Sequence, residues 1–307
     1  MTAIREKILG EFEIRKTKKQ KSAFRAWLKE TLEQEGYAVS EETGNFSTNV
    51  VAGDPDKAKV LFTAHYDTCP VLPFPNFITP RNFLFYILYQ FLICIPVFVL
   101  AFGGEIAVIR LFDAPMWAAI ATVYLLMGFM LWWIMDGPAN KHSANDNTSG
   151  VYTLLQIAHA IPAEARDKVA FVFFDNEEKG LFGSAAFAGK HKAIRKNTLV
   201  LNFDCVGDGD YLHFIPTKAV LKDTETRKLL ENAFPGGGEK TVTVIKGIYP
   251  SDQKNFKRGV GVCALKHHKI WGYYMDRIHT AKDTVLEEEN IALLRDGAVR
   301  LVETLSK

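Results

Sequence analysis

The sequence predicts an α/β fold: a mostly parallel mixed sheet sandwiched by helices, with a two-helix transmembrane hairpin inserted into it. Two observations lead to this prediction. Short apolar runs alternate with amphipathic segments along most of the chain, as in a mostly parallel sheet covered by helices. Two uncharged apolar runs, each long enough to cross a bilayer, interrupt this alternation.

The alternating elements can be placed by their hydrophobic periodicity. Helical periodicity predicts four helices, at Lys18 to Glu35, Gly150 to Ala160, Thr224 to Phe234 and Glu288 to Leu305. Short apolar runs predict three strands, at Ala58 to Ala64, Val169 to Phe174 and Leu199 to Phe203.

The inserted hairpin is predicted at Phe83 to Gly104 and Ala114 to Met135, which contain no charged side chain. A membrane-spanning helix needs about 20 apolar residues, and lipid tolerates a kink at Pro96. The short connection from Glu105 to Asp113 predicts an antiparallel pair that returns the chain to the side it left. A hydrophobic arm that packs on another subunit is the alternative. The predicted division is residues 1–80 and 139–307 for the two parts of one domain, and 81–138 for the insertion.

Membrane orientation rests on weaker signals. Arg81 and Lys141 flank the hairpin on one side and Arg110 lies in its turn, which is a small positive-inside bias. The charged, amphipathic segment from Met1 to Glu30 has no secretory signal pattern. We therefore expect an integral protein of the inner or cytoplasmic membrane, with both ends of the hairpin and the globular domain in the cytosol.

Composition narrows the possible partners. The 307-residue chain has a formal net charge of +2, which gives no reason to expect nucleic acid as a partner. The basic run from Arg15 to Lys21 is predicted to be a solvated helix face. The four cysteines lie far apart in the sequence, which favours a reducing compartment over a disulfide framework or a cysteine-rich zinc site.

Histidines and acids gather where the predicted strands end. His65-Tyr66-Asp67 follows the first strand, Asp175-Asn176-Glu177-Glu178 the second, and Asp204 the third. The turn from Ser143 to Gly150 precedes a helix, and Arg277 to Thr284 supplies another histidine before the last helix. Each has an ordinary structural explanation alone, such as helix capping for the turn. Together they supply the mixed nitrogen and oxygen ligands that catalytic zinc prefers.

In this order, the motifs HYD, NDNTSG, DNEEKGLFGS, Asp204 and RIHTAKDT resemble metallopeptidase family twenty-eight. This family includes di-zinc leucyl aminopeptidases, glutamate carboxypeptidases and the related glutaminyl cyclases. The resemblance covers the chain from about Lys18 to the end, without the hairpin, and implies the zinc-exopeptidase fold.

The resemblance also implies a role for each site residue. His65 and Asp204 would hold one zinc ion, Glu178 and His279 the other, and Asp146 would bridge them. Glu177 would be the general base and Asp67 the hydrogen-bond partner of His65. The resemblance makes the bond from Asp146 to Asn147 a candidate cis peptide. A pair of zinc ions would lower the pKa of a water between them and polarise the scissile carbonyl. Co²⁺ or Mn²⁺ could replace zinc.

The segment from Ile248 to Phe256 departs from the family pattern, because Gln253 stands where a histidine is common. Tyr249 is a candidate donor to the tetrahedral oxyanion, as in some relatives; a packing role for this tyrosine is equally compatible with the sequence.

The expected function is that of a membrane-anchored di-zinc aminopeptidase that removes amino-terminal residues from peptides. A carboxypeptidase that clamps its substrate through Arg258 or Arg277, a glutaminyl cyclase, and an inactive membrane receptor or scaffold are the alternatives. Because the insertion falls between His65 and Asp146, it would hold the cleft near the bilayer. This placement favours apolar or membrane-associated peptide substrates, and the hairpin would also offer a surface for association between copies of the chain.

Overall fold

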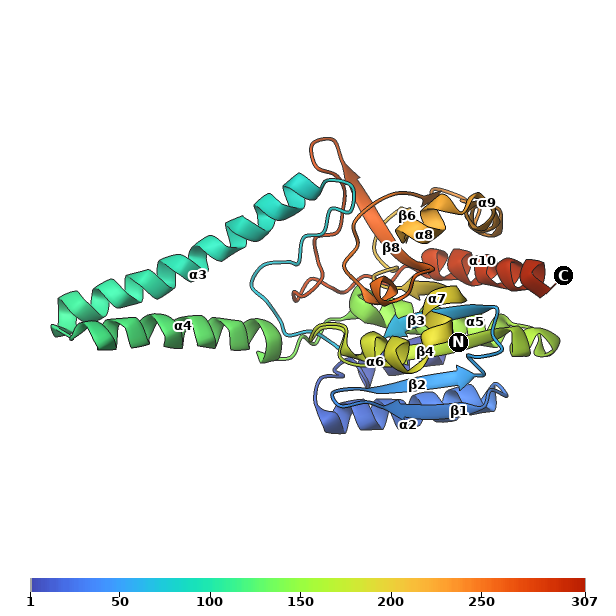
Figure 1. The fold of residues 1–307 in the computed structure, drawn as a ribbon, viewed down its shortest axis with the longest axis horizontal. Helices are drawn as coiled ribbons and strands as arrows, with labels where there is room; N and C mark the ends of the chain where they lie inside the picture. Colours follow the sequence, from blue (N-terminus) through green and yellow to red (C-terminus); the bar gives the residue numbers. More distant parts are fainter. Residues whose placement is uncertain (1, 307) are drawn as a thin grey trace.

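A computed structural model describes residues 2–306 and shows one sheet with helices on both faces and a long helical hairpin projecting to one side (Figure 1). The strands are β1 Val39–Thr43, β2 Thr48–Gly53, β3 Val60–His65, β4 Val169–Phe174, β5 Leu199–Phe203, β6 Tyr211–Pro216, β7 Thr241–Val244, β8 Gly259–His268 and β9 Gly272–Tyr274. The α-helices are α1 Thr2–Gly10, α2 Lys18–Gln34, α3 Phe83–Phe112, α4 Met116–Asp136, α5 Gly150–Ala160, α6 Phe182–Lys190, α7 Lys192–Asn197, α8 Lys218–Lys222, α9 Thr224–Ala233 and α10 Glu288–Ser306.

The strand order is β1-β2-β4-β3-β5-β8-β6-β7, and β9 pairs with β8. The central strands β4, β3, β5 and β8 are parallel to one another, and β2 and β6 pair antiparallel with β4 and β8 at the two ends of this group. The predicted mixed sheet covered by helices is therefore confirmed. The prediction included β3, β4 and β5 and missed the other strands; of these, β1 and β7 are short, polar and partly exposed.

Both faces of the central strands are buried, which explains their continuous apolar sequence. Alternate residues contact different helices, because successive side chains of a strand point to opposite faces. Phe62 and Phe171 belong to the core formed with α2, α5 and α10, whereas Leu61 and Val172 pack with residues of α6 and α7.

The prediction that the basic run is a solvated helix face is wrong for its two end residues. Arg15 is 0% exposed, and its guanidinium donates to the carbonyls of Tyr66 and Phe12 and to Oγ1 of Thr148. Lys21 is also buried, and its Nζ lies 2.7 Å from Oδ1 of Asp175. A side chain of this length reaches inward to carboxylates and carbonyls that lie far away in the sequence, which periodicity does not reveal.

The two helices of the hairpin, α3 and α4, expose most of their apolar side chains. Both helices are long and apolar enough to cross a membrane, and 6% of the most apolar window of each is buried. Helix α3 continues through the predicted turn and ends at Phe112, because Glu105 and Arg110 do not break a helix. Small residues lie where the helices meet: Ala101 and Ala119 are buried, and a Cβ added to Gly104 would lie 2.6 Å from Leu126.

The chain segments before and after the hairpin lie side by side on the domain. Pro70 and Ala139 form an antiparallel bridge, and Val71 N donates to Pro138 O at 2.8 Å. In the segment before α3, Phe77 stacks on Tyr274 of β9 with ring centroids 5.5 Å apart, and it also packs against Phe85 in the first turn of α3 at 5.7 Å. The hairpin thus leaves and re-enters the domain at one place.

Replacing Arg15 with methionine should destabilise the domain. The Arg15→Met variant leaves two buried carbonyls without their donor, at a cost of about 3 kcal/mol. For a chain of this size this lowers the thermal midpoint by about 5–10 °C. Thermal unfolding of the detergent-solubilised protein measures the change, with exposed Lys19→Met as the control. Equal midpoints for the two variants would contradict the structural role of Arg15.

Candidate active site

A polar cavity of about 330 Å³ opens beyond the carboxyl ends of β3, β4 and β5, where ligands bind in parallel sheets. Seven of the eight predicted site residues line it: His65, Asp146, Glu177, Glu178, Asp204, Tyr249 and His279. The eighth, Asp67, lies behind His65. The structure therefore brings together residues that are up to 214 positions apart, as His65 and His279 show.

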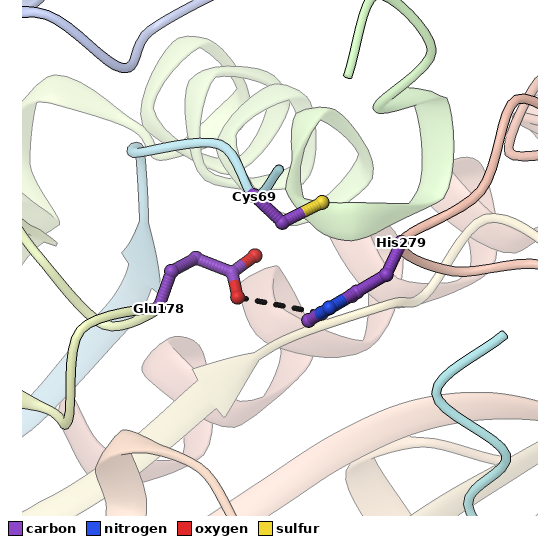
Figure 2. Close-up of side chains that lie close together, drawn as sticks. All are labelled: Cys69, Glu178 and His279. Carbon is purple, nitrogen blue, oxygen red and sulfur yellow. Dashed lines mark ion pairs between the residues drawn. The ribbon is translucent and has the colours of Figure 1, made fainter. Parts of the chain in front are cut away.

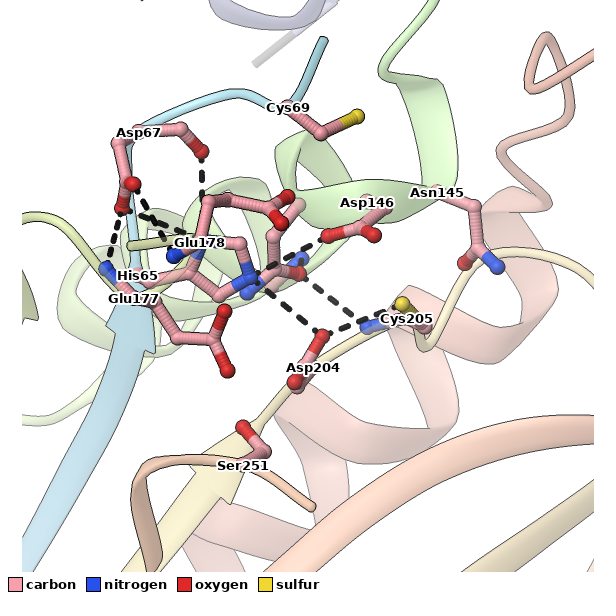
Figure 3. Close-up of polar contacts among 12 residues, drawn as sticks. His65, Asp67, Cys69, Asn145, Asp146, Glu177, Glu178, Asp204, Cys205 and Ser251 are labelled. Carbon is pink, nitrogen blue, oxygen red and sulfur yellow. Dashed lines mark hydrogen bonds and ion pairs between the residues drawn. The ribbon is translucent and has the colours of Figure 1, made fainter. Parts of the chain in front are cut away.

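Asp146 lies between the two histidines. Its Oδ1 is 3.2 Å from Nε2 of His65, and its Oδ2 is 3.1 Å from Nε2 of His279. Nε2 of His65 is also 3.6 Å from Oδ1 of Asp204, and Figure 3 shows these side chains converging. Each histidine thus faces a different oxygen of one carboxylate.

Glu178 completes the group on the side of His279. Its Oε2 lies 3.3 Å from Nε2 of His279 (Figure 2). Burial alone would lower the pKa of His279, but the negative charges of Glu178 and Asp146 outweigh burial and raise it to about 9. Burial raises the pKa of Glu178 to about 8, against the opposing effect of His279.

The donor set and its spacing fit a divalent metal. Nitrogen and oxygen ligands about 2.0–2.1 Å from a tetrahedral zinc ion lie about 3.3 Å from one another. The distances of 3.1 to 3.6 Å among His65, Asp146, Asp204, Glu178 and His279 agree with that value. In addition, Oε1 of Glu178 is buried and has no hydrogen-bond partner among the described residues.

Asp67 connects two parts of the site: the backbone of Glu177 and Glu178, and the ring of His65. Its Oδ1 and Oδ2 accept hydrogen bonds from the backbone N–H groups of Glu177 and Glu178, at 3.0 and 3.3 Å. Its Oδ1 also lies 3.5 Å from Nδ1 of His65. The backbone carbonyl of Asp67 lies closer to this nitrogen, at 3.2 Å, so the ring contacts both the main chain and the carboxylate of Asp67. The role of Asp67 as hydrogen-bond partner of a metal-bound His65 stays a prediction.

The turn around Asp146 is fixed by side chains from other segments. Asp283 accepts hydrogen bonds from the backbone N–H groups of Asn145 and Asp146, at 2.7 and 3.0 Å. Asn147 donates to the carbonyl of Phe203. Gly150 permits this approach, because an added Cβ would lie 2.2 Å from that carbonyl oxygen. The bond from Asp146 to Asn147 is cis, as predicted.

Glu177 and Asp252 are two further acids near the site; Asp252 is buried and Glu177 is half-buried. Burial raises the pKa of Glu177 well above its usual range; His65 opposes this shift, and the charges of Asp252 and Asp204 add to it. Burial also raises the pKa of Asp252 to about 7. Asp252 and Asp283 are functional-site residues that were not predicted from the sequence. Their positions in the SDQ and AKDT segments were the available signal.

Tyr249 is buried at the cavity wall, and its hydroxyl donates to the carbonyl of Asp204 at 3.0 Å. A role as oxyanion donor requires this bond to break, so that role stays a prediction. Gln253 lies behind the wall, where its Nε2 donates to the carbonyl of Tyr249 at 2.8 Å. It therefore supports the tyrosine in this structure.

The two arginines considered as carboxylate clamps are occupied elsewhere. Arg258 pairs with Asp223 at 3.0 Å, and Arg277 lies 3.4 Å from Asp208. Within residues 2–306, no arginine lines the cavity, and Lys254 is its one lysine.

Known proteins share both the sequence motifs and the fold. The sequence profile of Peptidase family M28 matches residues 130–299, which is more than half of the chain. A vacuolar membrane protease of Candida glabrata is 28% identical over 155 residues. That match covers 49% of this chain and 16% of the relative, so this chain spans a small part of the length of the curated protein.

Solved structures resemble the whole chain in fold at low identity. Glutaminyl cyclase of Porphyromonas gingivalis is 16% identical, with a TM-score of 0.62 over 96% of this chain and 94% of its own. LapA aminopeptidase of Legionella pneumophila is also 16% identical, with a TM-score of 0.60 over 99% of this chain and 69% of its own. A Zn-dependent exopeptidase of Parabacteroides distasonis has the same identity and a TM-score of 0.60, over 96% and 93%. With a family profile matched over more than half of its length, the chain is a member of Peptidase family M28.

Proposed function

We propose that this peptidase is a membrane-anchored aminopeptidase whose centre holds two zinc ions. The observation that carries the proposal is the position of Asp146, which presents one oxygen to each of two histidines. His65 and Asp204 would hold one ion, Glu178 and His279 the other, and Asp146 both. When bound, such a pair polarises the scissile carbonyl and activates a water molecule.

Glu177 is placed to move the protons of this reaction. Its side chain lines the cavity, while its backbone N–H is held by Asp67. A carboxylate with a raised pKa can accept a proton from the attacking water and then donate it to the leaving amine. Glu178 differs, because its carboxylate faces His279 and would be a ligand.

The cavity favours recognition of an amino terminus. Its described lining contains no arginine that would bind a terminal carboxylate. Three of its four acids, Asp146, Glu178 and Asp204, would be neutralised as metal ligands, so the lack of an arginine in the described lining is the feature that favours an amino terminus. Lys254 could bind a terminal carboxylate and is the one residue of the described lining that supports the carboxypeptidase alternative. A glutaminyl cyclase remains a further alternative, and a complete set of ligands for two ions suits peptide hydrolysis better.

The exposed hairpin supports anchoring in a membrane, with both connections on the same side. We place the catalytic domain on the cytosolic face of the inner or cytoplasmic membrane. Protease treatment of intact producing cells tests the orientation: the domain should be digested only after the membrane is broken.

An apolar groove of about 290 Å³ at the root of the hairpin favours apolar peptides as substrates. It lies between α3 and α4 and includes Leu72 and Val97 in its wall. Leu72 N donates to the carbonyl of His279 at 2.7 Å, so one backbone segment separates the groove from the catalytic cavity. An apolar portion of a membrane-associated peptide would occupy this groove.

Metal binding should release protons at pH 7. His279 and Glu178 face each other and the pKa of each is raised, so this pair holds at least one proton at pH 7 in the metal-free protein. That proton must be lost before both groups can ligate. The apparent zinc affinity should therefore rise about tenfold per pH unit for each proton released as the pH increases from 6 to 8. Calorimetry in buffers of different ionisation enthalpy measures the proton count. An affinity that does not change over this range would contradict the proposed ligands.

Replacing the general base should strongly reduce turnover and leave the zinc content unchanged. We expect Glu177→Gln to lower kcat by about 10²–10⁴-fold with unchanged zinc content, because only proton transfer is lost. Exposed Glu303→Gln is the control. The assay uses free and amino-blocked peptides, with and without chelator.

Chelator-sensitive release of the first residue from free peptides alone supports the aminopeptidase. Release of the last residue would instead indicate a carboxypeptidase, and cyclisation of amino-terminal glutamine a cyclase. No turnover by the metal-loaded protein would indicate a receptor or scaffold.

The bilayer should increase the preference for apolar substrates. The test compares two peptide substrates that have the same first residues. One of them carries an apolar tail that partitions into vesicles. We expect the ratio of their kcat/KM values to be about tenfold higher in liposomes than in detergent, because the membrane concentrates the tailed peptide. Val97→Trp should fill the groove and reduce this gain. Val99→Trp on the exposed side of the same helix should not.

Equal ratios in liposomes and detergent would contradict the delivery of substrate by the membrane. Equally efficient cleavage of both peptides after removal of the hairpin would also contradict the delivery of substrate by the membrane. Anchoring alone would then be the function of the hairpin.

A further inference from the structure

Cys69 is a buried thiol next to the metal-binding side chains that the proposed reaction leaves without a role. It is 0% exposed and lies in the segment between β3 and the hairpin. Three possible ligand atoms lie within 4.8 Å of one another: Sγ of Cys69, a carboxylate oxygen of Glu178 and a ring nitrogen of His279. Figure 2 shows the Cys69 side chain beside the ion pair of Glu178 and His279, with the sulfur on the side away from Glu178.

Among the described residues, three groups of candidate ligands lie close enough to hold a metal ion: His65, Asp146 and Asp204; Cys69, Glu178 and His279; and His65, Glu177 and Glu178. Only the second of these groups contains sulfur. Asp146 also faces His279, so Cys69 would add a fourth protein ligand to Glu178, His279 and Asp146. Catalytic zinc can expand to five ligands, which keeps a position for water.

A second observation at this position points to a ligand. The side chain of Glu178 is 8% exposed, and its Oε1 has no hydrogen-bond partner in residues 2–306. A buried carboxylate oxygen without a partner is costly unless a cation compensates it. Glu178 and His279 line the catalytic cavity, whereas Cys69 does not. The thiol therefore approaches from the protein side and leaves the cavity side open for water and substrate.

Asn140 holds Cys69 beside the loop that carries His279. Asn140 N donates to the carbonyl of Cys69 at 3.1 Å, and its Nδ2 donates to the carbonyl of Thr280 at 3.0 Å. The same Nδ2 lies 4.0 Å from Sγ of Cys69. The segments that enter and leave the hairpin thus position the thiol against the metal-binding loop.

We infer that the Cys69 thiolate is a further protein ligand, the fourth, of the ion held by Glu178, His279 and Asp146. The inference rests on the metal centre proposed above. On ligation the sulfur–hydrogen bond breaks, the proton passes to solvent, and a sulfur–metal bond forms. The two positions of the centre then differ chemically: one has only nitrogen and oxygen donors, and the other includes sulfur. Sulfur selects zinc or cobalt over manganese and magnesium at that position.

X-ray absorption of the zinc-loaded, full-length protein tests the inference directly, without a variant that must fold. One zinc–sulfur distance of about 2.3 Å is expected, beside shorter nitrogen and oxygen distances. The cobalt-substituted protein should show a thiolate-to-cobalt charge-transfer band. The band should be lost in Cys69→Ser, and one metal equivalent should bind at least about tenfold more weakly.

Two other buried cysteines provide matched controls. Cys205 lines the cavity, and its Sγ lies 3.1 Å from Oδ1 of Asp204, so it is the rival source of a thiolate band. Cys263 lies in β8, and its Sγ contacts the carbonyl of His213. Cys205→Ser and Cys263→Ser should both retain the band.

Bound zinc or cobalt without sulfur in its shell would overturn the inference and leave the proposed metal centre intact. Loss of the band in Cys205→Ser with retention in Cys69→Ser would also overturn it. Failure of the wild-type protein to bind either metal would overturn both the inference and the proposed centre.

Discussion

The carboxylate of Asp146, placed between His65 and His279, is the contact on which the rest of the site depends. The two rings come from the end of β3 and from the loop before α10, and each faces a different oxygen of one carboxylate. This requires that the carboxylate have one fixed orientation. Asp283 fixes this orientation, because its carboxylate accepts hydrogen bonds from the backbone N–H groups of Asn145 and Asp146.

Such a concentration of buried acids is unstable without compensating charge. Asp146, Glu177, Glu178, Asp204 and Asp252 lie in and around one cavity, together with two histidines. In the metal-free chain, burial raises the pKa of Glu178 and Asp252, so protons partly offset the repulsion. A pair of divalent ions would replace those protons. The repulsion among these acids is thus itself a reason to expect metal in this member of the family.

The hairpin is accommodated because it leaves and returns at one place. The bridge between Pro70 and Ala139 closes the domain beneath it, so the insertion does not separate His65 from Asp146. The same junction contains Cys69 and Asn140, which contact the loop that carries His279. The root of the hairpin is therefore part of the wall of the site, and a change there reaches the ligands through two hydrogen-bonded segments.

The sequence by itself predicted three of the four central strands (β3, β4 and β5), the apolar hairpin, and the residues that meet in the cavity. Strand burial and membrane length are local properties, and the motifs lie at strand ends whose parallel direction brings them to one edge of the sheet. Tertiary structure alone decided the inward course of Arg15 and Lys21, the support of Asp146 by Asp283, and the place of Cys69 beside Glu178. Each of these depends on contacts between segments far apart in the sequence. Local periodicity describes which face of an element is buried, but it does not determine which distant side chain that face will meet.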